Sequence, residues 1–170
     1  MYRMNLYLLR HGIAVEPGTP GYAKDADRPL TPKGERKLRN IASAMKALEL
    51  EFDRVLFSPY VRARGTAVII AKELGLEKKL EKCDALTPGG NLREVVDVLN
   101  HLKPAPENVL LVGHEPSMSE LAAFLISGET TVSITMRKGG LCKLTAESLR
   151  PGRCASLDWL LTPKQMSLIG

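Results

Sequence analysis

The sequence predicts an α/β protein with a mostly parallel central sheet, covered by helices on both faces to give three αβα layers, and antiparallel strands toward an edge. Three observations predict it. Short apolar runs at 5–9, 54–57 and 108–112 have the length and composition of buried strands. Amphipathic helical patterns lie between these runs. The C-terminal part instead carries hairpin-like strands. Because 170 residues suit one domain, we expect residues 1–170 to form a single domain.

The first two helices follow from their terminal signals. Apolar residues at 38–48 repeat at helical spacing, with Thr31 as N-cap and Pro32 at the first helical position. Ser58-Pro59 is expected to open the second helix in the same way, and Gly75 to end it.

Two more helices are expected further along the chain. The apolar face at 92–99 predicts a third, with Asn91 and Glu94 placed as a variant capping box. A fourth, with apolar positions at 118–125, follows Pro116.

Three strands are expected after the fourth helix. The segments 132–136, 140–145 and 155–161 alternate or run apolar at strand length. Gly139-Gly140 and the run Arg150–Arg153 carry the glycines and proline of their turns.

Composition narrows the class of protein. The net charge of +5 suits an anionic ligand, while an aromatic content of 5% leaves few stacking platforms for nucleic acid. No apolar run reaches the roughly 18 residues of a membrane helix, and a strand pattern close to Met1 leaves no room for a signal peptide. The three widely spaced cysteines form no C-x-x-C pair. We therefore expect a cytoplasmic protein with reduced thiols, and neither nucleic acid nor membrane as a partner.

Histidine and arginine side chains follow three of the predicted strands. Arg10-His11, the run from Ser58 to Arg62, and Gly113-His114 all lie at carboxyl ends, where ligands bind in open α/β sheets. Arginine offers a planar fork of donors for phosphate oxygens, and a neutral imidazole is a competent nucleophile. The pattern therefore predicts phosphoryl transfer, in which fixed positive donors stabilise the transferred group.

These motifs resemble the histidine phosphatase superfamily, also called the phosphoglycerate mutase-like fold. The resemblance runs in order over residues 4–126, through Leu9-Arg10-His11-Gly12, Arg28-Pro29-Leu30-Thr31 with Gly34, Ser58-Pro59 and Arg62-Ala63 with Thr66, and Val112-Gly113-His114. The short chain, the run Leu86–Gly90 and the tail Trp159–Thr162 look most like the bacterial SixA-type phosphohistidine phosphatases.

The resemblance implies a role for each catalytic residue. His11 becomes transiently phosphorylated. Arg10 and Arg62 bind the phosphoryl oxygens, and His114 donates to them in the transition state. The mechanism it implies uses no metal and no other cofactor.

The resemblance also implies the substrate contacts and partners. Arg28 is an auxiliary contact, and Ser58 and Gly12 are further candidates for substrate binding. The expected partner is a phosphoprotein that carries phosphohistidine in signalling or phosphotransfer, and the product is inorganic phosphate.

One departure from the family concerns the proton donor. Many members place an acidic residue in the segment that corresponds to Cys83–Leu86, but the aligned position is Ala85, with Asp84 adjacent. An alkoxide leaving group benefits from such an acid, typically by about 10²–10⁴-fold, whereas a phosphoramidate nitrogen is readily protonated. The departure favours phosphohistidine. Two alternatives stay open: a phosphatase of small phosphomonoesters or phosphoanhydrides, and a non-catalytic phospho-binding module, against which the pair His11 and His114 argues.

The segment 13–29 is long for a connection in a compact domain and is expected at the rim of the pocket. The chain has no room for the lid insertions of larger members. We therefore expect a shallow, open site, with His11 in a loop mouth outside the core.

Overall fold

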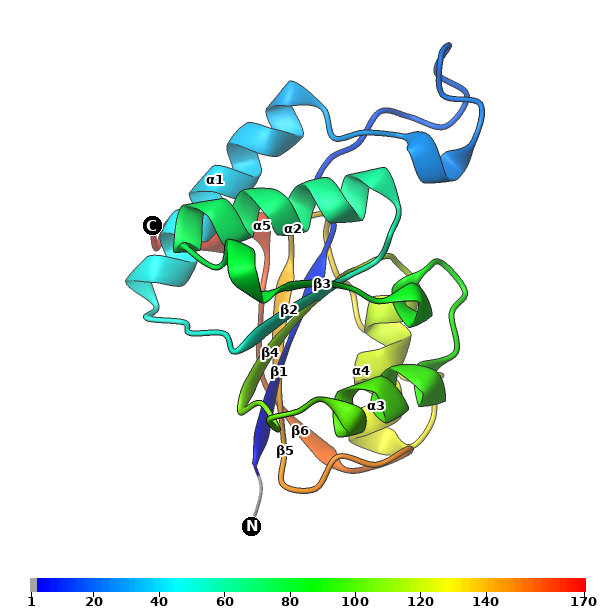
Figure 1. Ribbon diagram of the computed structural model, residues 1–170, viewed down its shortest axis with the longest axis vertical. Helices are drawn as coiled ribbons and strands as arrows, with labels where there is room; N and C mark the ends of the chain where they lie inside the picture. The colour runs from blue at the N-terminus through cyan, green and yellow to red at the C-terminus, as the bar shows by residue number, and fades with distance from the viewer. Residues whose placement is uncertain (1–2) are drawn as a thin grey trace.

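The computed structural model describes residues 3–170, which build one six-stranded sheet between two groups of helices (Figure 1). The strand order is β3-β2-β4-β1-β5-β6. The strands are β1 (Met4–Arg10), β2 (Arg54–Phe57), β3 (Leu80–Lys82), β4 (Asn108–Gly113), β5 (Leu141–Ala146) and β6 (Ala155–Leu161).

Helices cover both faces of this sheet. One face carries α1 (Pro32–Ala47), α2 (Val61–Leu74) and the short α5 (Pro163–Met166), and the other carries α3 (Leu92–His101) and α4 (Ser117–Ser127) (Figure 1). Short 3₁₀ turns lie at η1 (Asp25–Asp27), η2 (Glu77–Lys79) and η3 (Asp84–Leu86). Each face of the sheet has its own buried apolar cluster. The predicted three-layer α/β fold is confirmed.

Strand direction follows the prediction. β3, β2, β4 and β1 are parallel, and β5 and β6 continue the sheet as an antiparallel pair toward one edge. In the register, Arg10 lies opposite Gly113 and Phe57 lies opposite Val112. The residues that follow these strands therefore emerge together at one end of the sheet.

The predicted terminal signals hold for the first helix and for the end of the second. The Thr31 hydroxyl accepts a hydrogen bond from the Gly34 amide at 3.0 Å, with Pro32 in the first turn. Gly75 ends α2 in the left-handed conformation, at φ 69°, which a residue without Cβ adopts at little cost.

Two predicted helix starts were wrong in detail. The second helix begins at Val61 with Tyr60 as N-cap, because the Ser58 side chain bonds His114 instead of capping. At α3 the Asn91 side chain accepts from the Arg93 amide at 2.9 Å, and Glu94 completes no capping box.

The strand assignments need two corrections. Residues 132–136 form no strand. This stretch passes the carboxyl end of β1, where the Met136 carbonyl accepts a hydrogen bond from the Arg10 side chain. Conversely, β3 was not predicted, because Leu-Glu-Lys is a short polar run at the edge of the sheet. Across residues 3–170, none of the helices combines the length and apolar character that crossing a membrane requires.

Candidate active site

The three sequence motifs meet where β1, β2 and β4 end. His11 follows β1, Ser58 follows β2 and His114 follows β4, while Arg62 comes from the first turn of α2. The rings of His11 and His114 lie 5.2 Å apart between centroids. All four side chains are buried: Ser58 is 0% exposed, His114 2%, Arg62 4% and His11 7%.

The protonation of His11 follows from its contacts. Its Nδ1 lies 2.7 Å from the Gly12 carbonyl oxygen, which can only accept, so Nδ1 carries the proton. Nε2 therefore holds a free electron pair, which accepts from Arg62 Nε at 3.2 Å. Burial lowers the pKa of His11 to about 4, against the opposing effect of the Gly12 hydrogen bond. His11 is a neutral imidazole with an available Nε2 near pH 7.

Gly12 fixes the backbone beside His11. Its amide donates to Thr66 Oγ1 at 3.0 Å, and the Thr66 hydroxyl donates to the Arg62 carbonyl at 2.8 Å. A Cβ at Gly12 would lie 2.8 Å from Leu38 Cδ1. In this structure Gly12 thus ties the β1 end to α2, and its amide is already occupied by Thr66.

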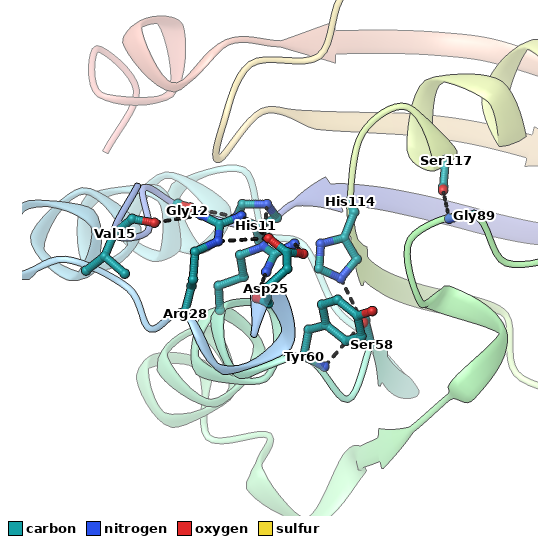
Figure 2. A network of polar contacts seen from close by, with 11 residues as sticks. His11, Gly12, Val15, Asp25, Arg28, Ser58, Tyr60, Gly89, His114 and Ser117 are labelled. Atoms are coloured by element: carbon teal, nitrogen blue, oxygen red, sulfur yellow. Dashed lines mark hydrogen bonds and ion pairs between the residues drawn. The ribbon is translucent and has the colours of Figure 1, made fainter. Parts of the chain in front are cut away.

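His114 is oriented by Ser58. Ser58 Oγ lies 2.8 Å from His114 Nε2 and accepts a longer bond, 3.4 Å, from the Tyr60 amide. Among residues 3–170 no other acceptor is recorded for the Ser58 hydroxyl proton, so we assign this proton to the bond with His114 Nε2 and the His114 proton to Nδ1. Burial lowers the pKa of His114 to about 3, and the nearby His11 adds to the effect. Figure 2 shows one ring nitrogen of His114 bonded to Ser58 and the other turned toward His11.

Two buried polar side-chain atoms lack a hydrogen-bond partner among residues 3–170, namely Arg10 Nε and His114 Nδ1. Both belong to this site and both are donors in the forms deduced above. Leaving buried donors unsatisfied costs about 1–3 kcal/mol each, so their presence together indicates a place built for an anion. Arg10 is otherwise anchored by its Nη1, which donates to the Met136 carbonyl at 2.9 Å.

Asp25 forms an ion pair with the Arg62 guanidinium in this structure, a contact that the sequence did not predict. Arg62 Nη2 donates to Asp25 Oδ2 at 2.9 Å, and Arg62 Nη1 donates to the Asp25 carbonyl at 2.7 Å. Arg28 donates to Asp25 Oδ1 through both Nε, at 2.8 Å, and Nη2, at 2.6 Å (Figure 2). Arg28 Nη1 also donates to the Val15 carbonyl. Arg28 thus reaches the site through Asp25.

The charge on Asp25 is well defined. Burial acts to raise the pKa of this carboxyl group, but the hydrogen bonds from Arg28 and Arg62 outweigh it and hold the pKa below its ordinary value. Asp25 is therefore an anion near neutral pH. The Asp-x-x-Arg spacing of Asp25 and Arg28 within a turn is the one sequence signal that hinted at this pair.

Tyr60 is a second residue that the sequence analysis missed. Its ring contacts His114 edge to face at 5.2 Å, and the Arg62 guanidinium carbon lies 5.3 Å from its centroid. Tyr60 therefore packs against both His114 and Arg62 and limits where each can move.

The site is less exposed than the expected shallow, open one, since its four side chains are buried, whereas His11 does lie in the loop after β1 and outside both apolar clusters. The reason is the segment 13–29, which reaches over the strand ends and places Asp25 on Arg62. The predicted position of this segment at the rim of the pocket agrees with the contacts of Asp25 and Arg28.

Known proteins resemble this chain in sequence. Residues 6–87 match the Histidine phosphatase superfamily (branch 1). Phosphohistidine phosphatase SixA of Escherichia coli K12 is 30% identical over 166 residues, covering 97% of this chain and 98% of that protein. The chain belongs to the histidine phosphatase superfamily.

Other relatives within the superfamily agree in length and fold. An uncharacterised protein of Picosynechococcus sp. is 38% identical over 149 residues, covering 86% of this chain and 88% of that protein. A solved structure of the protein histidine phosphatase SixA complexed with tungstate superposes with a TM-score of 0.80 at 29% identity, covering 95% of this chain and 98% of that one. As a histidine phosphatase superfamily member, the protein is a hydrolase of a family that does not need a metal.

Proposed function

We propose that this protein is a phosphohistidine phosphatase, which removes a phosphoryl group from a histidine of a signalling or phosphotransfer protein. The observation that carries the proposal is a neutral imidazole whose Nε2 lone pair faces Arg62, beside two buried donors that have no partner among residues 3–170. A nucleophile and an anion site are the two parts that covalent phosphoryl transfer needs.

In the proposed reaction, His11 Nε2 attacks phosphorus while the bond from phosphorus to the substrate nitrogen breaks. The other ring nitrogen of the substrate takes up a proton from solvent before the attack, so the substrate leaves as neutral imidazole and the enzyme supplies no acid. Water then attacks the phosphoryl group on His11, which releases inorganic phosphate and the His11 imidazole.

The other site residues hold the transferred group or each other. Arg62 and Arg10 supply guanidinium donors for the phosphoryl oxygens, and His114 donates a hydrogen bond to them from its Nδ1. Ser58 is a positioning residue, since its contact is to His114 Nε2. Arg28 and Gly12 support the site through Asp25 and Thr66.

Similarity supports the substrate class. Two SixA relatives that are named phosphohistidine phosphatase or its homolog are 30% and 34% identical to this chain. The unpaired cysteines suit a reducing compartment, and we place the reaction in the cytoplasm.

The test is a substrate panel combined with trapping of the intermediate. Wild type should release phosphate from a phosphohistidine peptide and from phosphoramidate, and rapid alkaline quenching with labelled substrate should retain phosphate on His11. His11→Gln should abolish both turnover and labelling, while a cooperative thermal unfolding transition should show that the variant is folded. Label on another residue, or full activity of the variant, would disprove the nucleophile; binding without turnover in wild type would favour a phospho-binding module.

A further inference from the structure

An open groove of about 570 Å³ lies beside the phosphoryl site, between the end of β1, α1 and α5. Five cations line it and no carboxylate does; they are Arg10, Lys37, Arg137, Lys138 and Lys164. A further hollow of about 340 Å³ shares Lys37, Pro163 and Lys164 with it, which extends the groove along α1 and α5. The feature is therefore elongated and begins at a residue of the proposed active site.

The groove cations are equal in number to the excess of basic over acidic residues in the chain. The sequence has 24 Lys and Arg against 19 Asp and Glu, an excess of five. Without the five groove cations, the remaining basic residues equal the acidic residues in number.

These cations are largely uncompensated. Among the described residues, Lys138 pairs with the exposed Glu16 at 3.9 Å, and no ion pair within 4 Å joins Arg10, Lys37, Arg137 or Lys164 to an acid. Like charges gathered without acids repel one another, so the arrangement favours an anionic partner.

The groove is held in a fixed relation to the nucleophile. The turn that carries Arg137 and Lys138 is fastened to β1, because the Gly139 amide donates to the Arg10 carbonyl at 3.0 Å and the Arg10 amide donates to the Gly140 carbonyl at 3.1 Å. Gly139 has a φ of 80°, and a Cβ there would lie 2.8 Å from Ile41 Cδ1 on α1. A partner lying in the groove would therefore be aligned with His11.

The groove suits a polypeptide better than a nucleic acid. Its lining includes the half-buried Ile13 and Pro163, which offer apolar contact, and it contains no aromatic residue on which a base could stack. We propose that this groove docks an acidic segment of the protein that carries the phosphohistidine. The proposal rests on the proposed function and adds to it the kind of substrate protein.

The probes are two peptides of equal length, each with one histidine phosphorylated by phosphoramidate treatment. One carries a run of Glu beside the histidine, and the other carries Gln at those positions. The double variant Lys37→Glu/Lys164→Glu reverses the charge at two of the five groove cations, which leaves three cations and two carboxylates, without touching the proposed catalytic residues. Lys72→Glu/Lys78→Glu is the matched control, since both lysines are exposed, neither lines the groove, and the net charge changes equally.

At low salt, wild type should hydrolyse the Glu peptide with a kcat/KM about tenfold above that of the Gln peptide, and added salt should reduce the difference. The groove variant should lose this preference, the control should keep it, and all three proteins should hydrolyse phosphoramidate within about twofold of one another. No preference in wild type, or an unchanged preference in the groove variant, would overturn the proposal.

A binding measurement separates this proposal from the proposed function. Fluorescence anisotropy with the unphosphorylated Glu peptide should show weaker binding by the groove variant than by wild type, whatever the enzyme hydrolyses. Failure to hydrolyse any phosphohistidine peptide would count against the proposed function alone. Tighter binding of a short single-stranded DNA than of the Glu peptide, lost in the groove variant, would show that the groove serves nucleic acid and would overturn peptide docking.

Discussion

Asp25→Asn should tighten the binding of phosphate and vanadate. In the structure the Nε and Nη2 atoms of Arg62, which form the edge suited to two phosphoryl oxygens, donate to His11 Nε2 and to Asp25 Oδ2. An incoming anion must therefore displace the Asp25 carboxylate from Arg62. Asparagine keeps the shape of the side chain but removes the competing charge.

The size of the effect follows from how exposed the two partners are. Ion pairs at the surface contribute about 0.2–1 kcal/mol, and hydrogen bonds to charged groups contribute about 1.5–3 kcal/mol. The Asp25 side chain is 52% exposed while Arg62 is buried, so solvent screening keeps the contact toward the low end of these ranges. We take about 1 kcal/mol, which is about a fivefold change in the inhibition constant.

The assay is competitive inhibition by vanadate with phosphoramidate as substrate, together with calorimetric titration of phosphate. Because the pKa of Asp25 is lowered, its carboxylate stays ionised from pH 5 to 8 and the gain should be the same throughout this range. Asp27→Asn is the control, since Asp27 is an exposed acid of the same turn, and no hydrogen bond or ion pair of its side chain is recorded among residues 3–170. Weaker vanadate binding by Asp25→Asn would show that Asp25 organises Arg62 for the anion rather than competing with it.

Three other predictions concern His114, the histidine protonation states and the packing beneath the site. Ser58→Ala removes the donor that sets the His114 tautomer. It should lower kcat/KM by about 10²-fold, the lower end for a lost oxyanion donor, with little change in substrate affinity. Wild-type kinetics in this variant would refute the role of Ser58. Burial lowers the pKa of His11 to about 4 and that of His114 to about 3, both below the ordinary value of about 6.5. In ¹⁵N NMR spectra both rings should therefore stay neutral and protonated on Nδ1 as the pH falls from 7 to 5. Titration of either ring near pH 6.5 would contradict the buried site. Helix propensity alone favours Gly34→Ala by about 1 kcal/mol, but its Cβ would lie within 2.2 Å of the Ile13 carbonyl oxygen, so urea unfolding should show a net loss of about 1–3 kcal/mol, and a gain would disprove the close approach.

The sequence predicts those site residues that directly follow a strand of the sheet. His11, Ser58 and His114 each follow a buried parallel strand directly, and the register of β1, β4 and β2 brings them together without any further information. Thr31 and Gly75 mark helix ends through purely local chemistry, so they too were predictable.

The features that sequence did not predict depend on contacts between distant segments. Asp25 meets Arg62 across 37 positions, and the Arg10 bond to the Met136 carbonyl spans 126. The second contact involves the stretch 132–136, whose composition predicts a strand that the structure does not form. The same long-range closure buried a site that the length of the chain alone suggested would be open.

The missing proton donor provides the test that separates the proposed function from the small-molecule alternative. Ala85, the position that we expect to correspond to the acid of other family members, is buried in the apolar cluster beneath α3 and α4. The adjacent Asp84 side chain is 71% exposed and pairs with Lys82 at 3.2 Å. We therefore expect neither residue to offer a carboxylic acid to a leaving group at His11.

Activity on nitrogen-linked phosphate should therefore exceed activity on alkyl phosphomonoesters by about 10²-fold or more, because an alkoxide needs the proton that this site does not supply. An aryl ester such as p-nitrophenyl phosphate should fall between them, since its leaving group needs little protonation. Asp84→Asn should change each of the three rates by less than about twofold, as expected for an exposed surface pair. If wild type hydrolysed alkyl esters efficiently and Asp84→Asn lost most of this activity, Asp84 would be identified as the acid. A small-molecule phosphatase would then be the better description, because only a leaving group that needs a proton gives such a residue a role.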